Sequence, residues 1–124
     1  MKVGDTWEHS WMVDQETYEQ FIALSQDRNP MHTSAEFARQ HGFEDKIVQG
    51  NVLNAFLSYF IGEMLPKKNV IILGQSIKYA KPIFVGDSID FTAKLSNHVE
   101  AVQVFEFDFQ FSKAGEKIAS GKIQ

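Results

Sequence analysis

The stretch on which the predicted fold depends is Gly50–Leu65, which reads GNVLNAFLSYFIGEML. Written as a helix, this stretch carries apolar side chains on almost every face. A helix of that kind is normally buried in the core of a protein. Pro66 follows directly, and the interior of a helix does not accommodate a proline ring. The sequence therefore predicts one long central helix that ends at Leu65.

Two segments in the second half of the chain alternate apolar and polar residues with a period of two. The apolar positions are Ile89, Phe91, Ala93 and Leu95 in the first segment, and Phe105, Phe107, Phe109 and Phe111 in the second. This period is typical of strands with one buried face. Residues 6–13 predict a further strand, and the stretches 85–88 and 113–116 have turn-forming compositions. An antiparallel sheet wrapped around a long apolar helix is an α+β arrangement of the hot-dog type, and we expect one such domain over residues 1–124.

Composition excludes several classes of protein. The chain has 124 residues, of which 44% are hydrophobic and 23% charged, and this suits one soluble globular domain. It has no apolar run of the ~18 residues that a membrane span needs and no signal-peptide core near Met1, so we expect a cytoplasmic protein without a membrane partner. A net charge of −4 argues against nucleic-acid binding. With no cysteine and no recognisable ligand spacing among the four histidines, we expect no metal site.

Two shorter helices are predicted in the first third of the chain. Asp14 is the predicted N-cap of the first helix. Pro30 ends that helix, because its ring disfavours the α region for Asn29. Residues 33–36, which read TSAE, have the form of a capping box that starts the second helix. Gly42 suits the position just after the end of that helix.

The strongest chemical signal is the segment Ser25–His32, which reads SQDRNPMH. It places the Asp27 carboxylate and the His32 imidazole five residues apart around an Asn-Pro turn. Together with the backbone N–H of Gly50 at a helix start, these groups supply a general base, a general acid and a hydrogen-bond donor. Each residue also has an ordinary interpretation, since Asp before Asn-Pro often only forms a turn. As a set, they suit the addition of water to a thioester-activated double bond, or its removal.

Several motifs along the chain are similar to those of one known family. They are Ser25–His32, Ala38, Gly42–Phe43, Ile47–Gly50, Leu73–Ser76 and Pro82–Asp87. At these positions the chain resembles the MaoC-like hot-dog proteins, which include (R)-specific enoyl-CoA hydratases and related acyl dehydratases. The similarity covers essentially the whole chain, and the hydratase motif is specific because several residue types recur at fixed offsets.

The resemblance implies a hydro-lyase that performs (R)-specific hydration of trans-2-enoyl-CoA to (R)-3-hydroxyacyl-CoA, and the reverse dehydration. By motif position, Asp27 and His32 are the catalytic pair. Gly50 is the backbone donor to the thioester carbonyl, Ser58 supports the catalytic aspartate, and Asn29 shapes the loop. Asp27 is expected to deprotonate the attacking water, and His32 is expected to hold that water and deliver a proton to C2.

The resemblance also implies a homodimer or a dimer of dimers, with paired sheets that run continuously and an acyl tunnel at the subunit interface. Ile61 is expected to line that tunnel. No separate cofactor is expected, because coenzyme A or the acyl carrier is part of the thioester substrate.

One position departs from the family pattern. The family usually has histidine before the motif glycine, and this chain has Gln49. The difference leaves open a non-catalytic acyl-thioester binding module, although a pure binder has no need of both Asp27 and His32. A 3-hydroxyacyl-acyl carrier protein dehydratase needs the same active groups and stays an alternative. A hot-dog thioesterase is disfavoured, because those enzymes lack the Asp-x-Asn-Pro-x-His arrangement.

Overall fold

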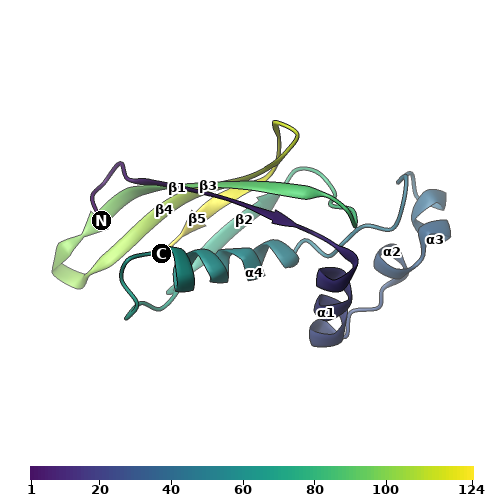
Figure 1. Cartoon of the computed structure of the whole chain (residues 1–124), viewed down its shortest axis with the longest axis horizontal. Coiled ribbons are helices and arrows are strands. Elements are labelled where there is room, and N and C mark those ends of the chain that lie inside the picture. The colour runs from purple at the N-terminus through teal and green to yellow at the C-terminus, as the bar shows by residue number, and fades with distance from the viewer.

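Five antiparallel strands form a single sheet, and the central helix lies across one face of it (Figure 1). The computed structural model describes residues 1–124. The strands are β1 (Thr6–Met12), β2 (Gln75–Tyr79), β3 (Ser88–Val99), β4 (Val104–Lys113) and β5 (Glu116–Ile123), in the spatial order β1-β3-β4-β5-β2. This arrangement confirms the predicted α+β fold of the hot-dog type.

The segments predicted as strands from their period lie at the centre of the sheet. β3 and β4 pair antiparallel, with Phe91 opposite Phe111. β4 and β5 are joined by a hairpin whose turn residues, Ala114 and Gly115, both have positive φ (50° and 78°). The edge strand β2 is absent from the sequence predictions, because only Ile77 of its five residues is even partly buried and the strand therefore has no apolar alternation.

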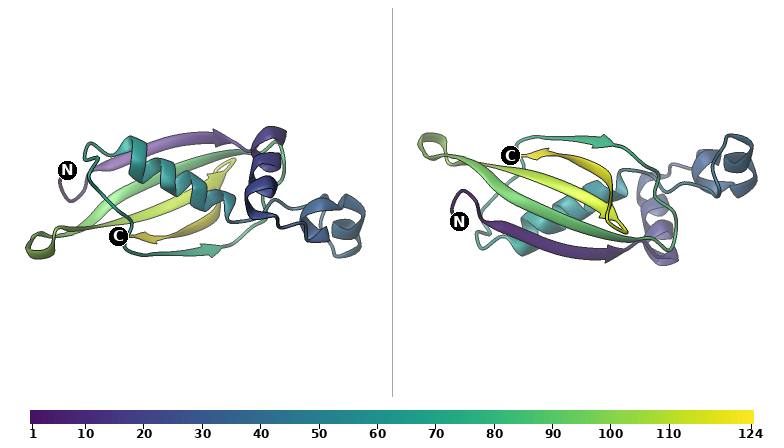
Figure 2. Two further views of the ribbon diagram at one scale, coloured as in Figure 1. Left: turned by 90° about the horizontal axis from the view of Figure 1, so that it is seen from below. Right: turned by 90° about the horizontal axis from the view of Figure 1, so that it is seen from above.

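Four α-helices accompany the sheet. They are α1 (Gln15–Ser25), α2 (Pro30–Thr33), α3 (Ala35–Gln40) and α4 (Val52–Tyr59), which continues as the π-helical turn η1 (Phe60–Met64). A 3₁₀ turn, η2 (Glu100–Val102), joins β3 to β4. Helices α1 to α3 lie at and beyond the end of the sheet to which the N-terminus of α4 points (Figure 2). No helix in the structure combines the length and the apolar character that crossing a membrane requires.

The helix starts follow local capping chemistry. Asp14 caps α1 as predicted, because its carboxylate accepts a hydrogen bond from a first-turn N–H at 2.8 Å. Helix α3 is capped by Ser34, so the capping box predicted to start at Thr33 is one residue early. Thr33 instead ends α2, a single turn that starts at Pro30 and that the sequence did not predict.

Aromatic rings hold α4 and η1 against the sheet. Phe60 is fully buried and packs edge-on against Phe107 of β4, with ring centroids 5.2 Å apart. Phe56, about one turn earlier, stacks on Trp11 of β1 with centroids 4.6 Å apart. Such pairs contribute ~0.5–1.5 kcal/mol beyond the area that they bury. This packing sets the axis of α4, and with it the place where the helix begins.

The opposite face of α4 is exposed, so the prediction of a helix buried on all sides is wrong for the single chain. Ser58 and Tyr59 both lie on that face, and Tyr59 is 42% exposed. Large apolar side chains are also exposed just before the edge strand β2, with Ile71 at 79% and Leu73 at 62%. The reason is that all five strands lie on one side of the helix (Figure 2).

The close approach of β2 to β5 generates a first prediction. A Cβ atom added at Gly121 of β5 would lie 1.8 Å from the carbonyl oxygen of Ser76 and 2.9 Å from the ring of Phe109. Gly121→Ala must therefore move the backbone of β2, and we expect it to lower the free energy of unfolding by ~1–3 kcal/mol. Urea denaturation followed by circular dichroism measures this loss. Gly74→Ala is the control, because a Cβ there meets nothing within 4 Å; equal stability of the two variants would contradict the prediction.

Candidate active site

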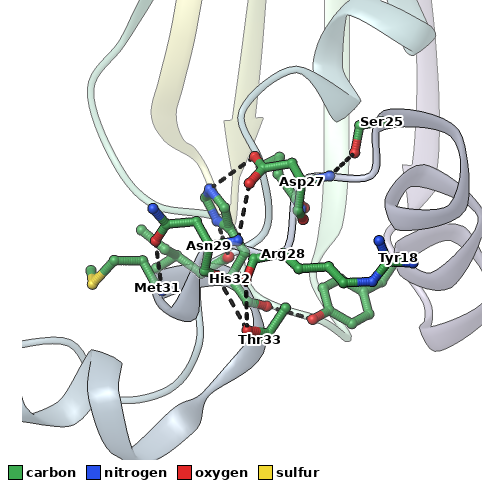
Figure 3. A network of polar contacts seen from close by, with 10 residues as sticks. Tyr18, Ser25, Asp27, Arg28, Asn29, Met31, His32 and Thr33 are labelled. Atoms are coloured by element: carbon green, nitrogen blue, oxygen red, sulfur yellow. Dashed lines mark hydrogen bonds and ion pairs between the residues drawn. The ribbon is translucent and has the colours of Figure 1, made fainter.

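The loop between α1 and α2 carries Asp27 and is shaped by its own side chains (Figure 3). Gln26, in the left-handed conformation, ends α1. The Asp27 carboxylate then accepts a hydrogen bond from the N–H of Asn29 at 3.1 Å, and the Asn29 side chain accepts one from the N–H of Met31 at 3.0 Å. These short-range bonds turn the chain from α1 into α2. Asn29 thus caps α2, and its part in the proposed site stays a prediction.

His32 lies on α2 with its imidazole directed toward Asp27 (Figure 3). Its Nε2 is 3.6 Å from Oδ2 of Asp27, and its Nδ1 is 2.8 Å from the backbone carbonyl oxygen of Ile47. A carbonyl oxygen only accepts hydrogen bonds, so Nδ1 carries a proton and the ring orientation is fixed. Nε2 is then the atom left to exchange a proton with a ligand or with the carboxylate.

Tyr18 of α1 holds the backbone of His32 in place. Its side chain is 5% exposed, and its hydroxyl donates a hydrogen bond to the carbonyl oxygen of His32. Burial raises the pKa of the Tyr18 phenol above its ordinary value near 10.0, so the hydroxyl stays protonated and able to donate at neutral pH. His32 is therefore anchored twice, through its ring by Ile47 and through its backbone by Tyr18.

Gly50 lies at the entry to α4. Neither its N–H nor that of Asn51 donates a hydrogen bond within the chain, and the Asn51 side chain does not cap the helix. Unpaired N–H groups at a helix N-terminus carry partial positive charge. A Cβ atom at Gly50 would lie 2.7 Å from the Tyr79 ring, whose hydroxyl accepts a hydrogen bond from Asn54 at 3.2 Å. A larger residue at position 50 therefore requires the Tyr79 ring or the start of the helix to move.

A surface pocket of about 410 Å³ joins these groups. Its walls include His32, Gly50, Tyr79 and Lys81, so the imidazole and the helix entry face the same space. Asp27 stands behind the imidazole, with its side chain 42% exposed against 20% for that of His32. The pocket therefore brings the His32 imidazole, which is paired with Asp27 outside the pocket lining, next to a region of positive potential at the helix start. Such an arrangement can stabilise a developing negative charge while a proton moves.

Two residues expected in the site lie away from this pocket in the single chain. Ser58 is exposed on α4 and has no hydrogen bond to Asp27, so its supporting role stays a prediction. Ile61 is 8% exposed and borders a separate cavity of about 340 Å³ at the other end of the helix. That cavity has mostly aliphatic walls, which include Leu65 and Val70, and the lining of an acyl tunnel by Ile61 also stays a prediction.

Sequence reasoning missed several contacts that hold the site. The hydroxyl of Tyr18, the carbonyl of Ile47 and the ring of Tyr79 are all contributed by residues that carry no chemical motif. Gln49 stands out in the sequence only as a departure from a pattern, whereas its amide donates a hydrogen bond to the carbonyl oxygen of Asp27 at 3.0 Å. No signal in the sequence reveals these contacts, since each depends on how distant segments pack. No three His, Cys, Asp or Glu side chains group in a way that would hold a metal ion.

Sequence relatives of the chain are named as hydratases and dehydratases. The (R)-specific enoyl-CoA hydratase of Aeromonas caviae is 45% identical over 69 residues, which cover 56% of this chain and 52% of that protein. The mitochondrial 3-hydroxyacyl-[acyl-carrier-protein] dehydratase of Arabidopsis thaliana is 29% identical over 89 residues, which cover 72% of this chain and 52% of that protein. The matched regions thus span about half the length of these curated relatives.

The fold is shared with a solved structure over almost its whole length. The structure of the (R)-hydratase from A. caviae involved in PHA biosynthesis superposes with a TM-score of 0.91 and 30% sequence identity, covering 99% of this chain and 94% of that one. The family model described as MaoC like domain matches residues 3–110, which contain the Asp27 loop, the helix entry and most of the sheet. From this match we conclude that the chain belongs to the MaoC-like domain family.

Proposed function

We propose that this chain is a hydro-lyase that hydrates trans-2-enoyl-CoA to (R)-3-hydroxyacyl-CoA and catalyses the reverse dehydration. One observation carries the proposal: the Asp27 carboxylate lies 3.6 Å from the His32 imidazole, beside a pocket that also contains the start of α4. The hydratase named for A. caviae supports the substrate class. No separate cofactor is proposed, because the thioester carrier is part of the substrate.

The proposed reaction needs three actions. A water molecule loses a proton as its oxygen attacks C3, C2 gains a proton, and the thioester oxygen carries the developing negative charge. A positioned general acid or base accelerates such steps by ~10²–10⁴-fold. Asp27 and His32 are close enough to bind one water molecule between them and the substrate.

The proton balance assigns a role to each member of the pair. The Asp27 carboxylate takes a proton from the attacking water, while protonated His32 gives the proton on Nε2 to C2. Asp27 is then neutral and His32 has lost one proton, so a transfer between Oδ2 and Nε2 restores the starting state. The hydrogen bond from Nδ1 to the carbonyl of Ile47 holds the ring in the same orientation throughout.

Gly50 is the proposed donor to the thioester oxygen. Its N–H is free and lies at the positive end of α4, and Gly50 lines the pocket that also contains His32. A backbone donor aimed at a developing oxyanion contributes on the order of 3 kcal/mol to the lowering of the barrier. The absence of a side chain also lets the thioester approach the backbone.

A 3-hydroxyacyl-acyl carrier protein dehydratase is the second candidate function. The relative in A. thaliana carries that name, and the same three groups would perform the dehydration. The two candidates differ in the carrier that binds outside the pocket, so the comparison of crotonyl-CoA with crotonyl-acyl carrier protein as substrates distinguishes them.

We also propose that the chain forms a homodimer. The exposed face of α4 and the apolar residues Ile71 and Leu73 beside the edge strand β2 support this, because an unpaired strand edge readily pairs with another strand. A second copy of the chain would extend the sheet across β2 and cover the exposed face of the helix. The aliphatic cavity beside Ile61 is the proposed place for the acyl tail of the substrate.

The acid–base pair generates a direct test of function. We expect Asp27→Asn and His32→Ala each to lower kcat for crotonyl-CoA hydration by ~10²–10⁴-fold, with unchanged thermal stability. Loss of enoyl-thioester absorbance measures the rate, and chiral chromatography identifies (R)-3-hydroxybutyryl-CoA. Asp45→Asn and His41→Ala are matched controls on exposed residues. Near-normal turnover by either site variant would show that the pair is not catalytic.

The fit of Gly50 beneath the Tyr79 ring generates a second test. Gly50→Ala forces the ring or the helix start to move, and we expect kcat/KM to fall by about tenfold. This is less than the 10²–10³-fold cost of removing a donor outright, because the Tyr79 ring can swing aside. The double variant Gly50→Ala/Tyr79→Ala should recover part of the rate. If the double variant recovers no rate, the methyl group added at position 50 lowers the rate by obstructing the substrate, and its clash with the Tyr79 ring is not the cause.

A further inference from the structure

Gln49 is the one polar residue among the buried residues of the chain, at 3% exposure. It stands between the strand-paired residue Val48 and Gly50, at the entry to α4. Its Nε2 donates a hydrogen bond to the backbone carbonyl oxygen of Asp27 at 3.0 Å, across 22 positions of sequence. Gln49 therefore joins the loop that carries the proposed base to the residue that carries the proposed oxyanion donor.

The orientation of the Gln49 amide follows from its partner. A carbonyl oxygen only accepts, so the NH₂ group faces Asp27 and Oε1 points the other way. Oε1 is buried there without a hydrogen-bond partner. An unpaired buried acceptor destabilises the folded state. An apolar side chain of the same size would suit the core better, so the benefit of the amide lies at its NH₂ end.

The bond from Gln49 is also the only long-range hydrogen bond that reaches Asp27. The other hydrogen bonds of Asp27 connect it with Ser25 and Asn29, which are two residues away on either side. Those local bonds shape the loop but do not place it relative to α4. The hydrogen bond from the Gln49 amide places the Asp27 loop relative to α4, because Gln49 is covalently joined to Gly50 at the helix entry.

We propose that Gln49 is a positioning residue for the reaction, which sets the place of the Asp27 carboxylate relative to the N–H of Gly50. This inference rests on the proposed function. Displacement of a reacting group by about 1 Å can lower the rate by ~10²-fold. Loss of the hydrogen bond between Gln49 and Asp27 should therefore lower kcat measurably. A histidine in place of Gln49 can also direct a ring N–H at the carbonyl of Asp27, and the same role can then be filled by either residue.

The test replaces the amide with a side chain of similar shape. Gln49→Met removes the donor to Asp27 and also the unpaired Oε1, so we expect the melting temperature to stay equal or to rise. For crotonyl-CoA hydration we expect kcat to fall by about 10–100-fold and KM to change by less than about threefold, because substrate binding does not use the Asp27 carboxylate. Gln49→His should recover kcat to within about threefold of the parent chain. Amide hydrogen exchange at Asn29 should be faster in Gln49→Met.

Gln110→Met is the matched control, because Gln110 is exposed on β4 and makes no side-chain hydrogen bond. A Gln49→Met variant with unchanged kcat, beside an active parent chain, overturns the positioning role alone. A variant that loses stability and rate together, without recovery in Gln49→His, overturns it in favour of a purely structural role. A parent chain that turns over neither crotonyl-CoA nor crotonyl-acyl carrier protein rejects the proposed function, and the positioning role with it.

Discussion

The packing of one face of α4 and η1 against the sheet is the interaction on which the rest of the structure depends. Leu57 and Phe60 are fully buried there, and burying an apolar side chain of this size contributes ~1.5–3 kcal/mol. Their contacts come from strands far apart in the sequence, so the helix cannot rotate or slide without losing several of them at once. The place of Gly50, just before the first turn, follows from this constraint.

The short segment that leads into α4, residues 47–50, connects this fixed helix to the proposed acid–base pair, Asp27 and His32. The carbonyl of Ile47 orients the ring of His32, the amide of Gln49 holds the backbone of Asp27, and Gly50 presents an unpaired N–H. Neighbouring residues of one segment thus contact or supply every group in the proposed mechanism. The pair itself lies on a loop and a single helical turn, which have little packing of their own, and so depends on these contacts for its position.

Several features of the site cost stability. The unpaired Oε1 of Gln49 costs ~1–3 kcal/mol, and the exposed side of α4 leaves Tyr59 facing solvent in the single chain. Departures of this kind from good packing and pairing are concentrated where a protein binds ligands or partners. In this chain they lie at the entry to α4, where Gln49 contacts the Asp27 loop, and along the side of the helix that a second copy is proposed to cover.

Local pattern by itself determined the central strands β3 and β4, the end of the apolar helix before Pro66 and the Asp14 cap, because each depends on residues close together in the chain. Motif resemblance pointed to Asp27, His32 and Gly50 as one site, and the structure brings these three together. Only the tertiary structure decided that α4 is covered on one side, that β2 is an edge strand, and that Gln49 holds the Asp27 loop. The physical reason is that these features depend on which surfaces the sheet covers and on contacts between residues more than 20 positions apart. Neither produces a periodic pattern of apolar residues in the sequence.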